Sequence, residues 1–285
     1  MTKPLLLLFV LSALAGAQGR RVFIVTDMEG VGGVNNAEEQ LLPGQRRYEE
    51  TRRLLTGELN AAIEGALEAG ATEIAVWDGH DGSRSLAIDE IHPRASLIQG
   101  RPTPANYYLE DRRYDGILFI GQHAMAGAKG GVLAHSQSFS VERITINGRA
   151  VGEIGQTAAI AGYFHIPVIM LSGDQAACDE IRELQPKAET VAVKHLAGKG
   201  SSWSLSHAEA KQRIRAAAAR AVKRIAEFQP WRIEGPVEMK IEYYPEAAGT
   251  PAAQLSRDSS KQVSPRTTIY RGSTVLEAYQ AWLGK

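Results

Sequence analysis

The 285-residue chain contains a single cysteine, Cys178, so it cannot form an intramolecular disulfide bond. In a helical-looking run and without a partner, such a cysteine is more often a small core residue than a nucleophile. The chain also lacks an excess of either charge, because 32 Lys and Arg residues balance 32 Asp and Glu residues. This balance, together with the absence of a basic run, argues against nucleic acid or an anionic membrane as a partner.

Several familiar catalytic motifs are missing as well. The sequence has no Walker-type phosphate loop, no Gly-x-Ser-x-Gly nucleophile elbow and no Gly-x-Gly-x-x-Gly after its first predicted strand. The segment Gly30-Val-Gly-Gly33 resembles the last of these only in being rich in glycine. Phosphate-loop, serine-hydrolase and dinucleotide chemistries are therefore poor explanations of the chain.

Long apolar runs are absent after the first segment, so we expect no transmembrane helix in the mature chain. The first segment has a short positive start at Lys3, an apolar stretch over residues 4–15, and the small-x-small sequence Ala15-Gly-Ala17. This is the anatomy of a secretory signal peptide, with an uncleaved anchor or a buried first helix as the alternatives. We predict cleavage after Ala17, a mature start at Gln18, and a periplasmic or extracellular protein.

The remaining pattern predicts an α/β fold. Hydrophobic residues make up 44% of the chain, which is enough for a packed core. Short β-branched runs alternate with helical segments, which is typical of a largely parallel sheet with helices on both faces. The predicted strands are 21–26, 73–78, 116–121, 167–172 and 189–194, the predicted helices are 48–69 and 153–164, and Asn147-Gly148 indicates a hairpin.

The composition changes from about Gly198, where a connector rich in glycine and serine begins. A long helix ending near Gln229, strands over 237–243 and 267–270, and a helix over 273–283 with Ser273 as its N-cap are predicted to follow. We therefore divide the chain into a signal peptide (1–17), an α/β metal-binding catalytic domain (18–195) and a smaller α+β C-terminal domain (196–285).

Polar side chains follow three of the predicted strands. The first strand ends in Asp27 and Glu29, the second in Asp78 and His80, and the third in His123. Because ligands bind at the carboxyl ends of strands in an open α/β sheet, we expect these side chains to meet at one edge.

A divalent metal explains this set most economically. Asp27 and Glu29 repel each other unless a cation or a proton lies between them. Two histidines with carboxylates suit zinc, and Asp27 is able to bridge a pair of ions. A two-metal site activates water and polarises a carbonyl or phosphoryl oxygen. On the residues alone, Glu153 is a helix cap, whereas His135 follows a glycine-rich stretch between two of the ligand segments, which favours a functional role.

From about Val22 to Trp282 the chain resembles the zinc-dependent D-aminopeptidase family of bacteria. The resemblance is carried by several motifs in the same order: Thr26-Asp-Met-Glu-Gly30, Arg47-Tyr-Glu49, Trp77-Asp-Gly-His80, His92-Pro93, Gly121-Gln-His-Ala124, Gly131-Val-Leu-Ala-His-Ser136, Asn147-Gly-Arg-Ala-Val-Gly-Glu-Ile-Gly155, Gly173-Asp174 and Leu276-Glu-Ala-Tyr-Gln280.

The resemblance implies a binuclear zinc peptidase with two Zn²⁺ per chain, assembled as a ring-like homodecamer. Its substrates would be short peptides with a free N-terminal D-residue. Asp27 matches the bridging carboxylate, Glu29 and His123 match ligands of one zinc, and His80 and Glu153 match ligands of the other.

His135 matches the catalytic residue of the family. On chemical grounds we expect it to shuttle a proton or stabilise the oxyanion while a metal-activated water attacks. The chain departs from the family in its leader and around residues 201–206, which affects location and specificity respectively.

Two alternatives stay open at this point. The same ligand set would serve another two-metal amidase or phosphoesterase, because the pocket decides the chemistry. An exported solute-binding protein is also α/β with a signal peptide, but it has no need of carboxylates and histidines at the strand ends.

Overall fold

The computed structural model describes residues 19–247 and 261–284. The predicted signal peptide and Gln18 lie outside this part of the chain. Within it, no helix has the length and apolar character needed to cross a bilayer.

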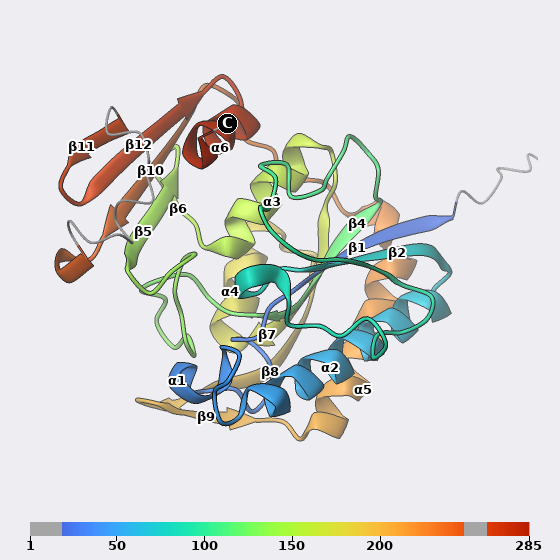
Figure 1. The fold of residues 1–285 in the computed structure, drawn as a ribbon. Helices are drawn as coiled ribbons and strands as arrows, with labels where there is room; N and C mark the ends of the chain where they lie inside the picture. The colour runs from blue at the N-terminus through green and yellow to red at the C-terminus, as the bar shows by residue number, and fades with distance from the viewer. Residues whose placement is uncertain (1–18, 248–260, 285) are drawn as a thin grey trace, which may run out of the picture.

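A seven-stranded sheet forms the centre of the molecule (Figure 1). Its strands, in spatial order, are β3 (Ser96–Ile98), β2 (Ala71–Asp78), β1 (Arg20–Thr26), β4 (Gly116–Gln122), β7 (Val168–Asp174), β8 (Glu189–Gly198) and β9 (Ser201–Ser204). All neighbours are parallel except β8 and β9, which form an antiparallel hairpin. The predicted largely parallel sheet is therefore confirmed.

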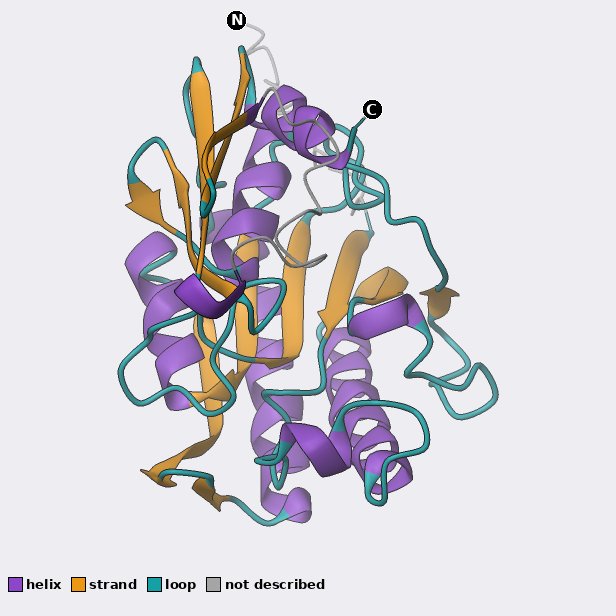
Figure 2. Ribbon diagram, turned by 60° about the vertical axis from the view of Figure 1, so that its left-hand side comes forward, coloured by secondary structure: helices purple, strands orange, loops and turns teal. Residues whose placement is uncertain are grey.

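Helices cover both faces of this sheet, as predicted (Figures 1 and 2). Val22 and Ile24 of β1 pack with α2 (Tyr48–Glu68) and α5 (His207–Lys223) on one face. Phe23 and Val25 point to the other face, toward α3 (Glu153–Tyr163) and α4 (Gln175–Leu184). All four side chains are buried, and each contributes about 1.5–3 kcal/mol through the hydrophobic effect. Cys178 is a buried free thiol on α4, in agreement with its predicted place in the core.

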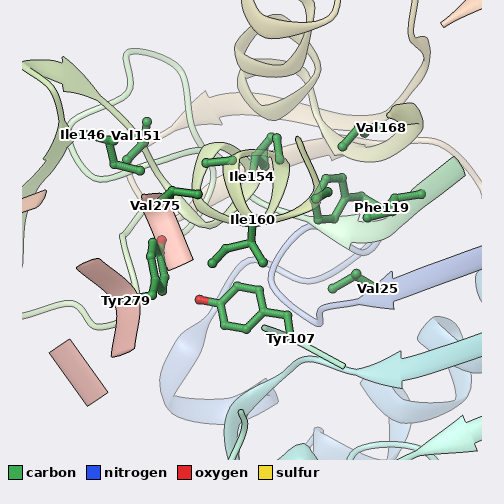
Figure 3. Packing of buried hydrophobic residues seen from close by; sticks show 14 of the residues in the cluster. Val25, Tyr107, Phe119, Ile146, Val151, Ile154, Ile160, Val168, Val275 and Tyr279 are labelled. Carbon is green, nitrogen blue, oxygen red and sulfur yellow. The ribbon is translucent and has the colours of Figure 1, made fainter. Parts of the chain in front are cut away.

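A second, antiparallel sheet lies beside the first. Its strands, in spatial order, are β11 (Gln262–Ser264), β12 (Thr267–Gly272), β10 (Val237–Tyr243), β5 (Val141–Ile146) and β6 (Arg149–Ala150). The last helix, α6 (Val275–Leu283), packs on this sheet and on α3. Figure 3 shows Ile154 and Ile160 of α3 between Val25 of the large sheet and Tyr279 of α6. Helix α3 is thus held from both sides.

Short helical turns complete the described elements: α1 (Ala37–Gln40) and the 3-10 turns η1 (Asp81–Ser83), η2 (Ile225–Glu227) and η3 (Pro245–Ala247).

The two sheets do not follow the predicted division near residue 195. Strands β5 and β6 precede that position but join the small sheet, whereas β9 and α5 follow it and belong to the large one. The reason is pairing between distant segments: β5 pairs with β10, and α5 packs against α2. Composition along the chain does not reveal such partners.

The predicted N-cap of the last helix is wrong by one residue. Thr274 occupies that position, and its Oγ1 accepts a hydrogen bond of 3.2 Å from the backbone N–H of Glu277. The backbone N–H and the hydroxyl of Ser273 instead donate hydrogen bonds of 2.7 and 2.5 Å to the Glu277 carboxylate. The arrangement is a variant of the capping box, in which the Glu277 side chain reaches back to Ser273, the residue before the N-cap.

The contact between α2 and α5 depends on a close approach at Gly65. A Cβ added there would overlap the carbonyl oxygen of Arg215 on α5. Gly65→Ala should therefore lower the free energy of unfolding by about 2 kcal/mol. Overlap with a backbone atom places the overpacking cost near the upper end of about 1–3 kcal/mol, and the helix-propensity gain of about 1 kcal/mol offsets only part of it. Urea denaturation measures this difference. Gly198→Ala is the control, since its added Cβ would lie 3.4 Å from Ser201 Oγ, an ordinary contact. Equal stability of Gly65→Ala and the wild type would contradict this packing.

Candidate metal centre

The predicted site residues meet where the strand order of the large sheet changes direction. Strand β1 has β2 on one side and β4 on the other, with Thr26 level with Asp78 and Ile120. In such sheets, ligands bind at this switch point, beyond the carboxyl ends of the strands. The structure brings all six predicted residues to this place: Asp27 and Glu29 after β1, His80 after β2, His123 after β4, His135 in the loop that follows, and Glu153 at the start of α3.

Asp27 lies at the centre of the cluster. Its Oδ1 is 3.1 Å from Nδ1 of His80, and its Oδ2 is 3.3 Å from Nε2 of His123. The carboxylate therefore faces one imidazole with each oxygen, which is the arrangement expected of a bridging ligand.

The two glutamates lie on either side of this centre. Glu29 Oε2 is 3.1 Å from Nδ1 of His80. Glu153 Oε1 is 3.5 Å from Nε2 of His123 and 3.7 Å from Nε2 of His135. All these side chains are buried except Glu153, whose side chain keeps 22% of its exposure. Three carboxylates thus share a small volume largely shielded from water.

Each histidine turns its other ring nitrogen toward a backbone carbonyl. The contacts are His80 Nε2 to Leu41 O at 2.8 Å, His123 Nδ1 to Ala124 O at 2.9 Å, and His135 Nδ1 to Leu133 O at 2.9 Å. A carbonyl only accepts, so the ring nitrogen beside it carries the proton and donates. The second nitrogen of each neutral ring then presents a lone pair to the carboxylates. This is the usual arrangement of histidines that bind a metal.

Lone pairs that face carboxylate oxygens require a positive charge between them. His123 Nε2 shows this most directly, because it is buried and has no hydrogen-bond partner among the described residues. Two sets of ligand atoms lie within 4.8 Å of one another: Asp27, Glu29 and His123, and His123, His135 and Glu153. This mixture of imidazole and carboxylate donors suits zinc.

The pKa shifts within the cluster also indicate a need for positive charge beside the carboxylates. Burial raises the pKa of Asp27, but the imidazoles of His123 and His80 that face its carboxylate outweigh burial and hold that pKa well below its usual range. Burial lowers the pKa of His123, whereas the nearby charges of Glu153 and Asp27 raise it well above its ordinary value. The site therefore favours cationic partners for its carboxylates. Zinc supplies that charge while leaving the imidazoles neutral.

The predicted assignment of ligands to individual zinc ions is only partly reflected in these contacts. Asp27, Glu29 and His123, predicted for one ion, lie close together. His80 and Glu153, predicted for the other, lie on opposite sides of Asp27, since His80 contacts Glu29 and Glu153 contacts His123. His135 is as close to Glu153 as a ligand would be. The individual roles of these residues stay predictions.

Glycines allow the two central loops to approach each other. The backbone N–H of Gly30 donates to Gly121 O at 2.7 Å, and that of Asp27 donates to Ile120 O at 2.9 Å. A Cβ on Gly30 would overlap the backbone of Gln122, and Gly121 has a φ of +76°. Larger residues would push the Asp27 and His123 segments apart.

Several residues that hold the ligands were not predicted from the sequence. Gln122 Nε2 donates to Asp27 Oδ2 at 2.9 Å, and the backbone N–H of Gln137 donates to Glu153 Oε1 at 2.8 Å. The fully buried Lys194 in the middle of β8 donates through its Nζ to the carbonyls of Glu29 and Val34. Burial lowers the pKa of Lys194 to about 8. A lysine within the apolar strand 189–194 was the available signal.

The chain is similar over nearly its whole length to known proteins. The Peptidase_M55 family model, described as D-aminopeptidase, matches residues 20–283. A D-aminopeptidase of Bacillus subtilis (strain 168) is 34% identical over 267 residues, covering 92% of this chain and 95% of the relative. The solved structure of the Zn-dependent D-aminopeptidase DppA from Bacillus subtilis, a self-compartmentalizing protease, superposes with a TM-score of 0.84 at 31% identity and covers 93% of this chain and 96% of that one.

The matched region includes every residue of the cluster and both sheets. The family match confirms the predicted enzyme, a hydrolase of peptide bonds, over a solute-binding protein. This chain belongs to the Peptidase_M55 family of D-aminopeptidases.

Proposed function

We propose that the chain is a binuclear zinc aminopeptidase that releases N-terminal D-amino acids, such as D-alanine, from short peptides or amides. One observation carries the proposal: three histidines and two glutamates gather around Asp27. Asp27, Glu29, His80, His123 and Glu153 would hold the two ions. The zinc dependence of the solved relative supports the choice of metal.

Bound zinc supplies Lewis acidity, which acidifies a water and polarises the scissile carbonyl. The side chains of the chain itself provide the rest. His135 is stacked between His123 and Phe139, with ring centroids 3.9 and 4.3 Å away, and its Nδ1 is tied to Leu133 O. Only its Nε2 is therefore available to the substrate, and its orientation is fixed. We assign His135 the transfer of a proton between the attacking water and the leaving amine.

The assembly is inferred to be a homo-oligomer, with a ring-like decamer as the expected form. Support comes from the related D-aminopeptidase, which is described as self-compartmentalizing. Enclosing the active sites within a ring would restrict access to short peptides, in line with the proposed substrates.

Export is the second part of the proposal. Its support is the sequence of residues 1–17, which lie outside the described residues. We expect the mature protein from the cell envelope to begin at Gln18, because signal peptidase cleaves after the small-x-small sequence ending at Ala17. Intact-mass analysis of that material measures the start. A chain that keeps Met1 and stays in the cytosol would rule export out.

Metal content tests the bridging role of Asp27. Asp27→Ala should lose more zinc than either His80→Ala or His123→Ala, because each histidine touches one side of the cluster and Asp27 touches both. Elemental analysis of protein purified without chelator and supplied with zinc gives the stoichiometry. Asp81→Ala is the matched control: it removes the exposed carboxylate next to His80, and should keep both ions. A wild-type protein that binds no zinc tightly would refute the functional proposal.

A second variant distinguishes a catalytic role of His135 from a role as a metal ligand. His135→Ala should keep its fold and both zinc ions, yet lose roughly 10²–10⁴ in kcat, the usual contribution of a positioned proton-transfer group. Kinetics and metal analysis of the same sample distinguish the roles. Loss of one zinc would make His135 a ligand, and unchanged kcat would remove it from the mechanism.

The substrate assignment is tested by a panel of small compounds. D-Ala-D-Ala and D-Ala amide should be hydrolysed faster than their L-forms, and N-acetylation should abolish turnover because the free amine is part of the recognised group. The panel includes a phosphoester to test the two-metal phosphoesterase alternative. Preference for L-substrates or full activity on the acetylated peptide would leave the metal centre standing but overturn the D-aminopeptidase assignment.

A further inference from the structure

Two cavities are lined by residues of the metal centre. One, of about 430 Å³, has largely apolar walls that include Trp77, Tyr107 and Trp282. The other, of about 530 Å³, extends past His80, His135 and Phe139. Both are lined by the same five residues, Asp27, Gly79, Arg101, Gln137 and Glu153. A substrate that spans the centre would therefore pass Arg101, whichever cavity takes its leaving group.

Arg101 is chemically distinct from the rest of the lining. Among the described residues that line either cavity, it is the only lysine or arginine. Its described ion pair is a contact of 3.4 Å between its guanidinium and Asp81 Oδ1, and both side chains are more than half exposed. Such surface pairs contribute little, and a guanidinium has five N–H donors. Most of the hydrogen-bonding capacity of Arg101 is thus open to a ligand.

The backbone that carries Arg101 is anchored next to the site. Gln99 Nε2 donates to Asp78 Oδ2 at 3.0 Å and to Leu86 O at 2.8 Å, and the backbone N–H of Gly100 donates to Ser83 O at 3.0 Å. Gly100 has a φ of +98°, a conformation that glycine adopts without strain. These contacts tie the segment to the end of β2, two residues from His80.

The apolar cavity offers space for a small side chain beyond the scissile bond. The rings of Trp77 and Tyr107 are 5.1 Å apart and form one wall, and Trp282 of α6 lines the cavity as well. In a dipeptide, the free carboxylate belongs to the second residue, which is the leaving group. The Cα of this residue lies about 3.8 Å from the Cα of the first residue. A cavity with apolar walls and a guanidinium beside the metal ligands matches that residue.

We propose that Arg101 binds the free C-terminal carboxylate of a short peptide substrate and so favours dipeptides over amides and longer chains. This inference rests on the proposed aminopeptidase function and names the substrate class of the same site. Arginine suits the task, because its planar fork pairs with both oxygens of a carboxylate.

The test compares two substrates that differ only in the carboxylate. Arg101→Gln should raise KM for D-Ala-D-Ala roughly 10- to 100-fold, with little change in kcat. This factor is the loss of affinity expected when a charge-assisted hydrogen bond to the substrate is removed. KM for D-Ala amide should stay unchanged, and Arg101→Lys should recover part of the loss. Arg94→Gln, an exposed arginine that lines neither cavity, is the matched control and should leave both substrates unaffected.

A binding measurement accompanies the kinetics. A D-Ala-D-Ala analogue with a reduced, uncleavable peptide bond should bind Arg101→Gln more weakly by the same factor. Isothermal titration calorimetry measures this affinity for both proteins. If wild type hydrolyses D-Ala amide but Arg101→Gln treats both substrates as wild type does, the carboxylate assignment is overturned and the proposed function stands. Equal loss on both substrates also overturns it. If wild type cleaves neither substrate, the proposed function itself fails.

Discussion

Mutual repulsion among Asp27, Glu29 and Glu153 is the constraint around which the site is organised. Three carboxylates in a largely buried space do not coexist without cations between them. Protonated imidazoles satisfy this need in part, which is why the pKa of His123 is raised despite its burial. The carbonyls beside the second ring nitrogens keep a proton on those nitrogens, so the inner nitrogens are the ones that can bind zinc in place of a proton.

The scaffold holds this arrangement from several directions. Parallel pairing makes the ends of β1, β2 and β4 level, and α3 carries Glu153 to the same edge while it is packed between the large sheet and α6. Lys194 reaches from the middle of β8 to the carbonyls of the Glu29 loop, and Glu58 on α2 accepts a 3.0 Å hydrogen bond from the backbone N–H of Gly32 in the same loop. The loop is thus fixed from both sides, which keeps the ligands in place before a metal binds.

Local pattern was sufficient to predict the five central strands of the large sheet, but not β3 or β9, the second of which lies in the predicted glycine- and serine-rich connector. It also predicted that Asp27, Glu29, His80 and His123 gather, because the carboxyl ends of parallel strands lie at the same edge of the sheet. The metal-ligand role of Glu153 and the catalytic role of His135 came from the family resemblance. A glutamate that opens a helix is typical of a cap, and the glycine-rich stretch before His135 indicates function without indicating which. The pairing of β5 with β10 and of α5 with α2 was not visible, because contacts between distant segments leave no periodicity. Lys194 was missed for the same reason: its carbonyl partners are about 160 residues away in the chain.

The account depends most on two metal ions bridged by Asp27. Anomalous X-ray diffraction from crystals of the zinc-loaded protein, measured on both sides of the zinc absorption edge, locates the ions without reference to activity. We predict two zinc peaks about 3.5–4 Å apart, with one oxygen of Asp27 near each or one oxygen shared by both. Zinc peaks away from Asp27, or no peak at the carboxyl ends of β1 and β4, would contradict the account.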